Sequence, residues 1–262
     1  LIQNKGLEFE LTATPIKSKN FSWSSSINIT IPSNKLLSFP GLSSSSYAVT
    51  YVEGKSLNLI YQLHSLGVDQ NSGIFSFEDV DKDGIVQIPQ DLKVNGSTDP
   101  KYYGGFLNTV SLKQFELNVF FDFKKQTGLN YLYSIYGNTY LPGFIGNEPA
   151  YILDRWQGPG DASEIQKFTT INYSDAYAAK EMLRNSNGVY SDASFLRMKT
   201  ISISWQLPSV ILKNIRTYNS KLSLTAQNLL TISSYKGTDP EIQNYYSLPA
   251  LRTIAAGINL TF

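Results

Sequence analysis

The chain has 262 residues, of which 42% are hydrophobic, 13% aromatic and only 16% charged, against about 25% charged in an ordinary soluble domain. The net charge of +1 argues against the basic face that nucleic-acid binding needs, and the absence of cysteine excludes disulfides, thiol catalysis and cysteine-based zinc sites. The single histidine, His64, excludes a multi-histidine metal site and makes a Ser-His-Asp triad improbable unless His64 is its base.

Abundant Tyr and Phe favour strands over helices. No stretch of the sequence approaches the ~20 apolar residues that a membrane helix needs. Because only helices and closed barrels satisfy their backbone groups in lipid, the sequence predicts either a soluble β protein or a transmembrane β-barrel.

Seven segments alternate apolar and polar residues, the pattern of a strand with one face toward lipid and one toward a lumen. They are residues 6–15, 20–32, 101–112, 115–126, 193–206, 216–229 and 250–262. The last is the clearest, with Ile254, Ala256, Ile258, Leu260 and Phe262 on one face. Glu8, Glu10, Glu116 and Asp122 fall on the opposite face, where we expect them to line a transport path or simply a hydrated wall.

A soluble β-sandwich produces the same alternation, since it also has a wet and a dry face. The connections favour the barrel, because residues 15–20, 112–115 and 207–216 are short links and residues 34–100, 127–192 and 229–249 are long ones. Bacterial outer-membrane barrels have short periplasmic turns and long extracellular loops. If Phe262 lies at the periplasmic rim, every short link falls on the periplasmic side.

The long links contain elements of their own. Residues 55–63 and 73–78 are strand-like and predict an extracellular hairpin. Residues 174–184 predict a short helix with Ser174 as its N-cap. Seven strands are too few to close a membrane-spanning barrel, so we expect further strands from upstream or from another chain.

Asp79, Asp81 and Asp83, followed by Gly84, match the first half of a calcium loop, in which oxygen ligands alternate and glycine makes the turn. The twelfth position is Gln90 instead of glutamate, which removes the bidentate ligand. Two interpretations stay open. The carboxylates bind Ca²⁺ and order residues 64–100, or they form an aspartate-rich turn that hydrogen-bonds its own backbone.

Arg155 and Trp156 lie in a long link and are candidates for stacking on a sugar ring or docking a partner, or for anchoring the loop onto itself. A tyrosine run raises the same choice between a ligand platform and loop packing; it consists of Tyr131, Tyr133, Tyr136 and Tyr140. The terminal Phe262 resembles the assembly signal of outer-membrane barrels, although it is also simply the last residue of a strand.

Six short segments, in order along nearly the whole chain, resemble the C-terminal third of SusC/RagA-type transporters. They are Asn4–Leu11, Phe77–Gly84, Asp99–Phe106, Arg155–Asp161, Ser194–Lys199, and Ala226–Leu230 with Gly237–Glu241. Each match is weak by itself, and six in the family's order are specific.

The resemblance implies an all-β, antiparallel transmembrane barrel of 22 strands with a plugged lumen, of which residues 1–262 form the C-terminal segment. It implies a TonB-dependent importer of oligosaccharides or peptides in the outer membrane of a Gram-negative, Bacteroidetes-like cell. The expected partners are a SusD-like surface lipoprotein, the rest of the barrel, the lipid bilayer, and TonB acting through a plug that this chain lacks. No cofactor is required, and calcium is the one candidate ion.

Two rival functions remain at this stage. One is a soluble β-sandwich that binds glycan, and the other is a β-fold glycoside hydrolase. Against the second, no carboxylate pair has a spacing that argues for glycosidase chemistry, so the sequence favours a transport component over an enzyme.

Overall fold

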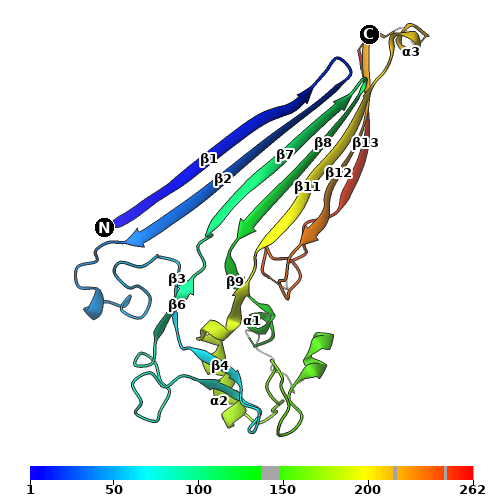
Figure 1. Ribbon diagram of the computed structural model, residues 1–262. Helices are drawn as coiled ribbons and strands as arrows, with labels where there is room; N and C mark the ends of the chain where they lie inside the picture. The colour runs from blue at the N-terminus through cyan, green and yellow to red at the C-terminus, as the bar shows by residue number, and fades with distance from the viewer. Residues whose placement is uncertain (137–147, 215–216, 245–246, 262) are drawn as a thin grey trace.

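Seven long strands form one antiparallel sheet in the computed structural model, which describes residues 1–136, 148–214, 217–244 and 247–261 (Figure 1). The strands are β1 (Ile2–Lys17), β2 (Phe21–Leu36), β7 (Tyr102–Leu112), β8 (Phe115–Lys125), β11 (Phe195–Gln206), β12 (Asn219–Ile232) and β13 (Thr253–Thr261). Each strand pairs with the next in this order. All seven predicted segments are therefore confirmed as strands of a single sheet.

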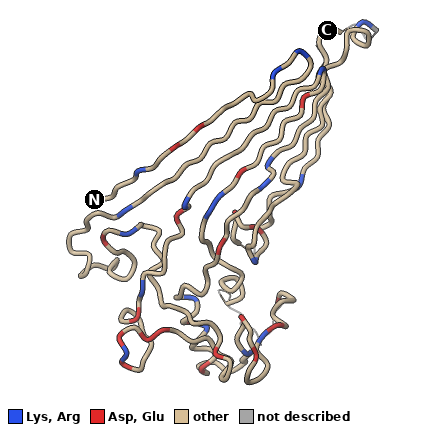
Figure 2. The backbone as a smooth tube through the Cα atoms, in the orientation of Figure 1, with Lys and Arg blue, Asp and Glu red and all other residues tan. Residues whose placement is uncertain are grey.

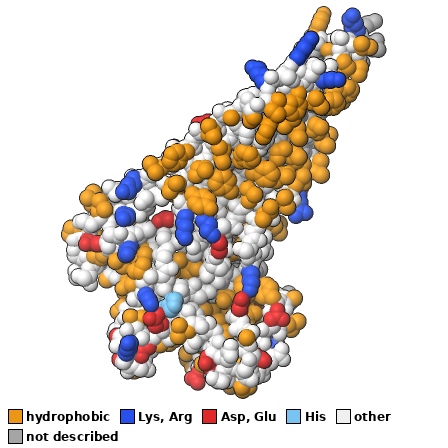
Figure 3. All heavy atoms as spheres, viewed as in Figure 1, with side chains coloured by type: hydrophobic (Ala, Val, Ile, Leu, Met, Phe, Trp, Pro, Cys, Tyr) orange, Lys and Arg blue, Asp and Glu red, His pale blue; other side chains and the backbone are white. Residues whose placement is uncertain are grey.

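The strand register aligns the predicted apolar faces into one continuous surface, here called the apolar face. Leu11 lies opposite Ile27, which lies opposite Phe106, and Phe121 and Met198 continue the row. Figure 3 shows hydrophobic side chains gathered over these strands. Many are exposed, such as Ile203 at 44% and Ile254 at 71%. So large an exposed apolar area marks an interaction with lipid or protein.

The connections separate by length onto the two ends of the sheet (Figure 1). The short ones, residues 18–20, 113–114 and 207–218, lie at one end, here called the turn end. The long ones, residues 37–101, 126–194 and 233–252, lie at the other, here called the loop end. The predicted alternation of short and long connections is confirmed.

The loop end contains small elements of its own. They are η1 (Leu42–Ser44), β3 (Leu59–Gln62), β4 (Ser65–Val68), β5 (Phe75–Phe77), β6 (Lys93–Ser97), β9 (Thr127–Leu129), α1 (Tyr131–Tyr136), η2 (Ala150–Asp154), α2 (Asp175–Arg184), η3 (Asn187–Val189) and β10 (Tyr190–Asp192). The remaining helix, α3 (Ser209–Asn214), lies at the turn end.

Two predictions for the loop end have different outcomes. The predicted helix is α2, and the Ser174 hydroxyl accepts a hydrogen bond from the Tyr177 amide at 3.3 Å, as an N-cap does. The predicted hairpin between residues 55–63 and 73–78 is wrong. Strand β3 pairs with β6, and β5 pairs with β4, because the chain between them folds back twice.

The hydrophobic core of the described residues lies at the loop end, not against the sheet. It is built from Phe75, Tyr131, Leu132, Ile135, Tyr136, Ile152, Ile165, Ala179, Leu183 and Val189. Among the described residues, no helix is both long enough and apolar enough to cross a membrane. The loop end is thus a packed unit, whereas none of the described residues forms such a layer over the apolar face of the sheet.

Strands β1 and β13 form the two edges of the sheet, and within the described residues each has a neighbour on one side only. An open edge of this length is a template for further pairing. The other sheets in the described part of the chain are two-stranded and lie at the loop end. The seven strands do not by themselves fix the total number in a complete barrel.

Candidate functional site

The sheet face opposite the apolar face is polar and extensively hydrogen-bonded. The Thr12 and Ser26 hydroxyls are 3.0 Å apart across β1 and β2. The Thr109 hydroxyl donates to Asn118 at 2.7 Å, and the Asn118 amide donates to Glu116 at 3.0 Å. The predicted polar rows therefore form one polar wall, the arrangement expected for the lumen side of a barrel.

A buried ionic cluster joins this wall to the β12–β13 connection. Nη2 of Arg197 donates to both carboxylate oxygens of Asp239, at 2.9 and 2.8 Å, and Nη1 donates to Glu241 at 2.8 Å. Arg197 and Asp239 are buried, and Nε of Arg197 also donates to the Thr231 hydroxyl. Two-point contacts of this kind fix orientation as well as charge, so the connection is held against β11.

Lys199 extends the cluster along β11. Its ammonium group lies 3.4 Å from the Asp122 carboxylate and 3.6 Å from that of Glu241. Relative to β8, Lys199 is the extra residue of a bulge, because Met198 pairs with Phe121 and Thr200 pairs with Phe120. The bulge places Arg197 and Lys199 within reach of the same loop carboxylate.

A cleft of about 560 Å³ opens between two of the long connections at the loop end. Its lining residues are Tyr131, Tyr151, Asp154, Ala162, Ser163, Glu164, Ile165, Lys236 and Gly237. A second cleft of about 520 Å³ shares Tyr131, Ser163, Glu164 and Lys236 with it. The combination of aromatic rings with carboxylates, hydroxyls and an amine suits a polar ligand such as a sugar or a peptide.

The boundary between the two clefts is an ion pair. Lys236 donates to the two carboxylate oxygens of Glu164, at 2.8 and 2.9 Å, and the Tyr131 hydroxyl donates to the same carboxylate at 2.5 Å. These hydrogen bonds, first from Lys236 and then from Tyr131, lower the pKa of Glu164. Glu164 and Lys236 are largely exposed, so the pair contributes little to stability and is accessible to a ligand.

The structure places Arg155 and Trp156 in contacts within the loop end. The Arg155 guanidinium lies 4.2 Å from the centre of the Phe168 ring. Nε1 of Trp156 donates to the backbone oxygen of Gln70 at 2.9 Å, and its ring packs directly on Gly73. These contacts match the interpretation in which Trp156 anchors the loop, and substrate contact by this pair stays a prediction.

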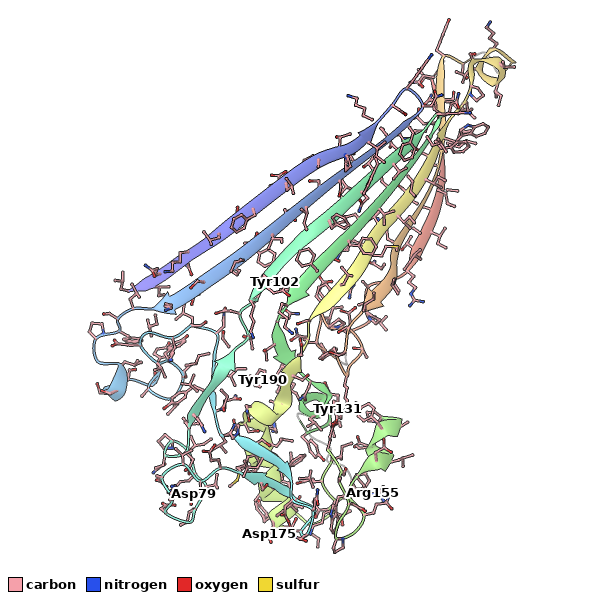
Figure 4. All side chains as sticks on the ribbon, viewed as in Figure 1. Asp79, Tyr102, Tyr131, Arg155, Asp175 and Tyr190 are labelled. Atoms are coloured by element: carbon pink, nitrogen blue, oxygen red, sulfur yellow. The ribbon has the colours of Figure 1, made fainter. Side chains whose placement is uncertain are left out.

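The tyrosine run divides between core and surface. Tyr136 is only 1% exposed, and its ring meets Phe75 edge-on at 5.2 Å. Tyr131 is buried apart from its hydroxyl end at the cleft, and Tyr133 is 40% exposed. Tyr140 lies outside the described residues. The structure thus gives Tyr136 a packing position, while Tyr131, which is labelled in Figure 4, lines the cleft.

The aspartate-rich loop brings together a different trio from the predicted one. Carboxylate oxygens of Asp79, Asp81 and Asp91 lie within 4.8 Å of one another. The Asp83 carboxylate instead accepts hydrogen bonds from the Ile85 amide and the Gln87 side chain. Asp79 accepts the amides of Lys82 and Gly84, so the turn that hydrogen-bonds its own backbone is present.

The pKa values of two carboxylates in this loop, those of Asp91 and Asp81, shift in opposite directions. Asp91 is fully buried, and hydrogen bonds from the amides of Gln87, Val80 and Asp81 hold its pKa below the ordinary value. Burial, together with the neighbouring carboxylates, raises the pKa of Asp81. A bound cation would relieve the repulsion at Asp81, so the donor set fits a hard cation such as Ca²⁺.

The sequence of this chain is similar to those of several TonB-dependent receptors. The chain is 26% identical to the TonB-dependent receptor P3 of Formosa agariphila and 28% identical to the TonB-dependent receptor SusC of Bacteroides thetaiotaomicron. It is matched over its whole length, against 29% and 26% of those receptors. These relatives are TonB-dependent receptors, and the chain is similar to receptors of the SusC/RagA type. No family model matches it.

Solved structures agree with this assignment at the level of fold. The structure of the RagAB peptide transporter superimposes with a TM-score of 0.76 at 22% identity, covering 100% of this chain and 29% of that one. The large antiparallel sheet therefore has the fold of the matching part of that barrel. The chain spans less than a third of the length of the relatives that it matches. Phe262, the candidate assembly signal, lies outside the described residues.

Sequence reasoning did not single out the ion pairs of the loop end. Arg197 was in the segment Ser194–Lys199, and Asp239 and Glu241 were in Gly237–Glu241, yet nothing in either segment indicates that the two meet. Tyr131 was recognised within the tyrosine run, but Glu164 and Lys236 carry no local signal. These residues converge only through the packing of connections distant in sequence.

Proposed function

We propose that this chain supplies part of the wall and extracellular loops of a TonB-dependent outer-membrane importer of oligosaccharides or peptides. The observation that carries the proposal is the continuous, exposed apolar face, backed by a hydrogen-bonded polar face. Such a sheet fits hydrocarbon on one side and a hydrated lumen on the other. Within the described residues no second layer covers the apolar face, which speaks against the β-sandwich alternative.

In this proposal residues 1–262 are the C-terminal barrel segment. The open edges at β1 and β13 pair with strands of the remaining barrel, and energy from TonB reaches the substrate through a plug outside this chain. The relatives are named as receptors and transporters, which supports a role other than catalysis. The loop end is then extracellular and the turn end periplasmic.

A SusD-like surface lipoprotein is the proposed partner at the loop end. Exposed apolar side chains there give it a contact surface, including Leu153, Ile171 and Tyr173. RagAB, named as a peptide importer, supports peptides as one substrate class, and SusC stands among the relatives. Co-purification of a lipoprotein with the full-length protein, lost when Tyr173 and Ile171 are changed to serine, tests this part.

The main test uses the full-length protein in its own cell. Deleting the gene should abolish growth on one oligosaccharide or on peptides as sole nutrient, and the protein should fractionate with the outer membrane. The folded protein should also migrate differently on a denaturing gel before and after boiling, as closed barrels do. Recovery of the protein without detergent, or unchanged growth on every nutrient, would contradict the proposal.

The cleft at Glu164 and Lys236 is the proposed place of substrate contact. Glu164→Gln removes the charge without changing shape, and we expect weaker uptake with little loss of stability, since the pair is exposed. Glu78→Gln is the matched control, because Glu78 pairs with Lys93 at 2.9 Å in a different connection. Equal uptake by the Glu164→Gln and Glu78→Gln variants would show that the cleft does not contact the substrate.

A further inference from the structure

The turn end carries basic residues and no acidic ones. Residues 16–22, 112–115 and 206–221 contain no Asp or Glu; all 21 acidic residues lie in other parts of strands or in the long connections. These ranges contain five exposed lysines. Lys221 lies within β12, and the other four lie in or directly beside the short connections and are here called the turn-end lysines: Lys17, Lys19, Lys113 and Lys213. Figure 2 shows this separation, with acidic positions gathered mainly at the loop end.

None of the turn-end lysines forms an ion pair with a carboxylate in the part of the chain that the structure describes. At the loop end, Lys93, Lys125 and Lys236 are each paired with a carboxylate within 3 Å, although Lys55, Lys82 and Lys101 are not paired within the described residues. The turn end is thus a concentration of positive charge that the described residues leave uncompensated.

Aromatic and apolar side chains lie between these lysines and the body of the apolar face. The rings of Phe115 and Trp205 stack with centres 5.8 Å apart and planes 9° apart. Phe115 and Leu112 are about half exposed, and Val210 of α3 is 71% exposed. Figure 3 shows basic side chains at the tip of the sheet, just beyond its hydrophobic surface.

From the centre of the sheet to its tip, the side chains are therefore first aliphatic and aromatic together, then include the stacked Phe115–Trp205 pair, and are cationic in the short connections. This is the order in which a bilayer presents hydrocarbon, interface and headgroup. Unpaired lysines at headgroup depth attract anionic lipids, and each contributes about fivefold to affinity for an anionic surface. Zwitterionic headgroups offer no net charge to compensate four ammonium groups.

We propose that the turn end binds anionic glycerophospholipids, with acyl chains on the Phe115–Trp205 surface and the phosphodiester among the turn-end lysines. The inference rests on the proposed function, because it needs the sheet to stand in a bilayer. It adds a lipid preference that would hold the periplasmic rim at a defined depth in the inner leaflet.

The test measures lipid retained by full-length protein in native mass spectrometry, comparing phosphatidylglycerol with phosphatidylcholine. The wild type should retain phosphatidylglycerol preferentially. A quadruple variant, K17Q/K19Q/K113Q/K213Q, should lose at least about tenfold of that preference, and the corresponding Lys→Arg variant should keep it. The control K55Q/K82Q/K93Q/K101Q makes the same charge change within one long connection and should retain the wild-type preference.

Each remaining outcome decides the proposal. Equal retention of the two lipids, or equal losses in the turn-end and control variants, would overturn it. Competition by glycerol 3-phosphate alone would show a free-phosphate site instead of a lipid surface. A protein that needs no detergent refutes the proposed function as well, whereas a detergent-dependent, heat-modifiable barrel without lipid preference refutes this inference only.

Discussion

Arg197 and Asp239, separated by 42 residues, form a two-point contact that fastens the β12–β13 connection to the polar face of the sheet. Arg197 is 1% exposed and Asp239 is 5% exposed. The other two guanidinium nitrogens donate hydrogen bonds to Glu241 and Thr231, so all three nitrogens of the Arg197 guanidinium are hydrogen-bonded. The position of the β12–β13 connection therefore depends on the buried charge of Arg197.

Asp239→Asn should therefore loosen the connection. The change leaves a buried guanidinium with half of its countercharge, and breaking a buried pair from one side costs about 3 kcal/mol or more. We expect a lower urea midpoint for the full-length protein in detergent and faster trypsin cleavage at Arg252. Glu78→Gln, in an exposed pair, should leave the urea midpoint nearly unchanged. Equal midpoints for the two variants would contradict the fastening role.

The packing of Trp156 on Gly73 gives a second prediction. A Cβ added at Gly73 would lie 2.3 Å from the indole ring, and its φ of +71° also disfavours a side chain. Gly73→Ala should displace Trp156 and raise the protease sensitivity of residues 148–173. Gly67→Ala is the matched control, with φ of +88° and nothing within 4 Å of the added atom. If both variants behave alike, backbone strain and not the indole contact is responsible.

Gly104 in β7 has no room for a side chain against the neighbouring strand β2. A Cβ there would lie 2.0 Å from the backbone oxygen of Asn28, which cannot move without breaking the β2–β7 ladder. Gly104→Ala should sharply reduce the heat-modifiable, folded fraction. At Gly257 an added Cβ meets only the Ser223 hydroxyl, so Gly257→Ala should fold normally. A fully folded Gly104→Ala protein would show that the strands can separate without cost.

The loop that contains Asp91 should lose stability at low pH. Because backbone amides lower the pKa of folded Asp91, its contribution to stability is complete above the ordinary pKa and is lost as pH falls through the folded value. Hydrogen exchange at the Val80 and Gln87 amides, corrected for intrinsic rates, should accelerate on acidification. Asp91→Asn should show reduced protection already at neutral pH and little further change. Asp83→Asn should retain the wild-type profile.

Calcium binding by this loop stays a hypothesis, with Asp91 now in the place of Asp83. Calorimetry of the full-length protein with Ca²⁺ should give a heat of binding that Asp81→Asn abolishes and Asp83→Asn preserves. Of these two residues, only Asp81 belongs to the cluster of Asp79, Asp81 and Asp91. Chelation should then reduce exchange protection in residues 79–91. Absence of heat, with unchanged protection under chelation, would leave the backbone-bonded turn as the sole role of these carboxylates.

Much of the sheet could be predicted from the sequence, because alternate residues of a strand face opposite sides of the sheet and match the polarity of each side. Ile254, Ile258 and Thr253 reveal which side meets an apolar medium wherever the neighbouring strand lies. Connection lengths likewise follow directly from the order of these segments. The helix at residues 175–184 was predictable since Ser174 caps it through a local hydrogen bond.

Only the tertiary structure decided which distant residues meet. Nothing local in Arg197 selects Asp239, and nothing in Glu164 selects Lys236, because ion pairs between connections depend on the packing of whole loops. The burial of Tyr136 and the replacement of Asp83 by Asp91 arose in the same way. Strand periodicity is a local property of the chain, whereas loop contacts are long-range and carry no period, so the sequence determined the wall and the fold decided the candidate site.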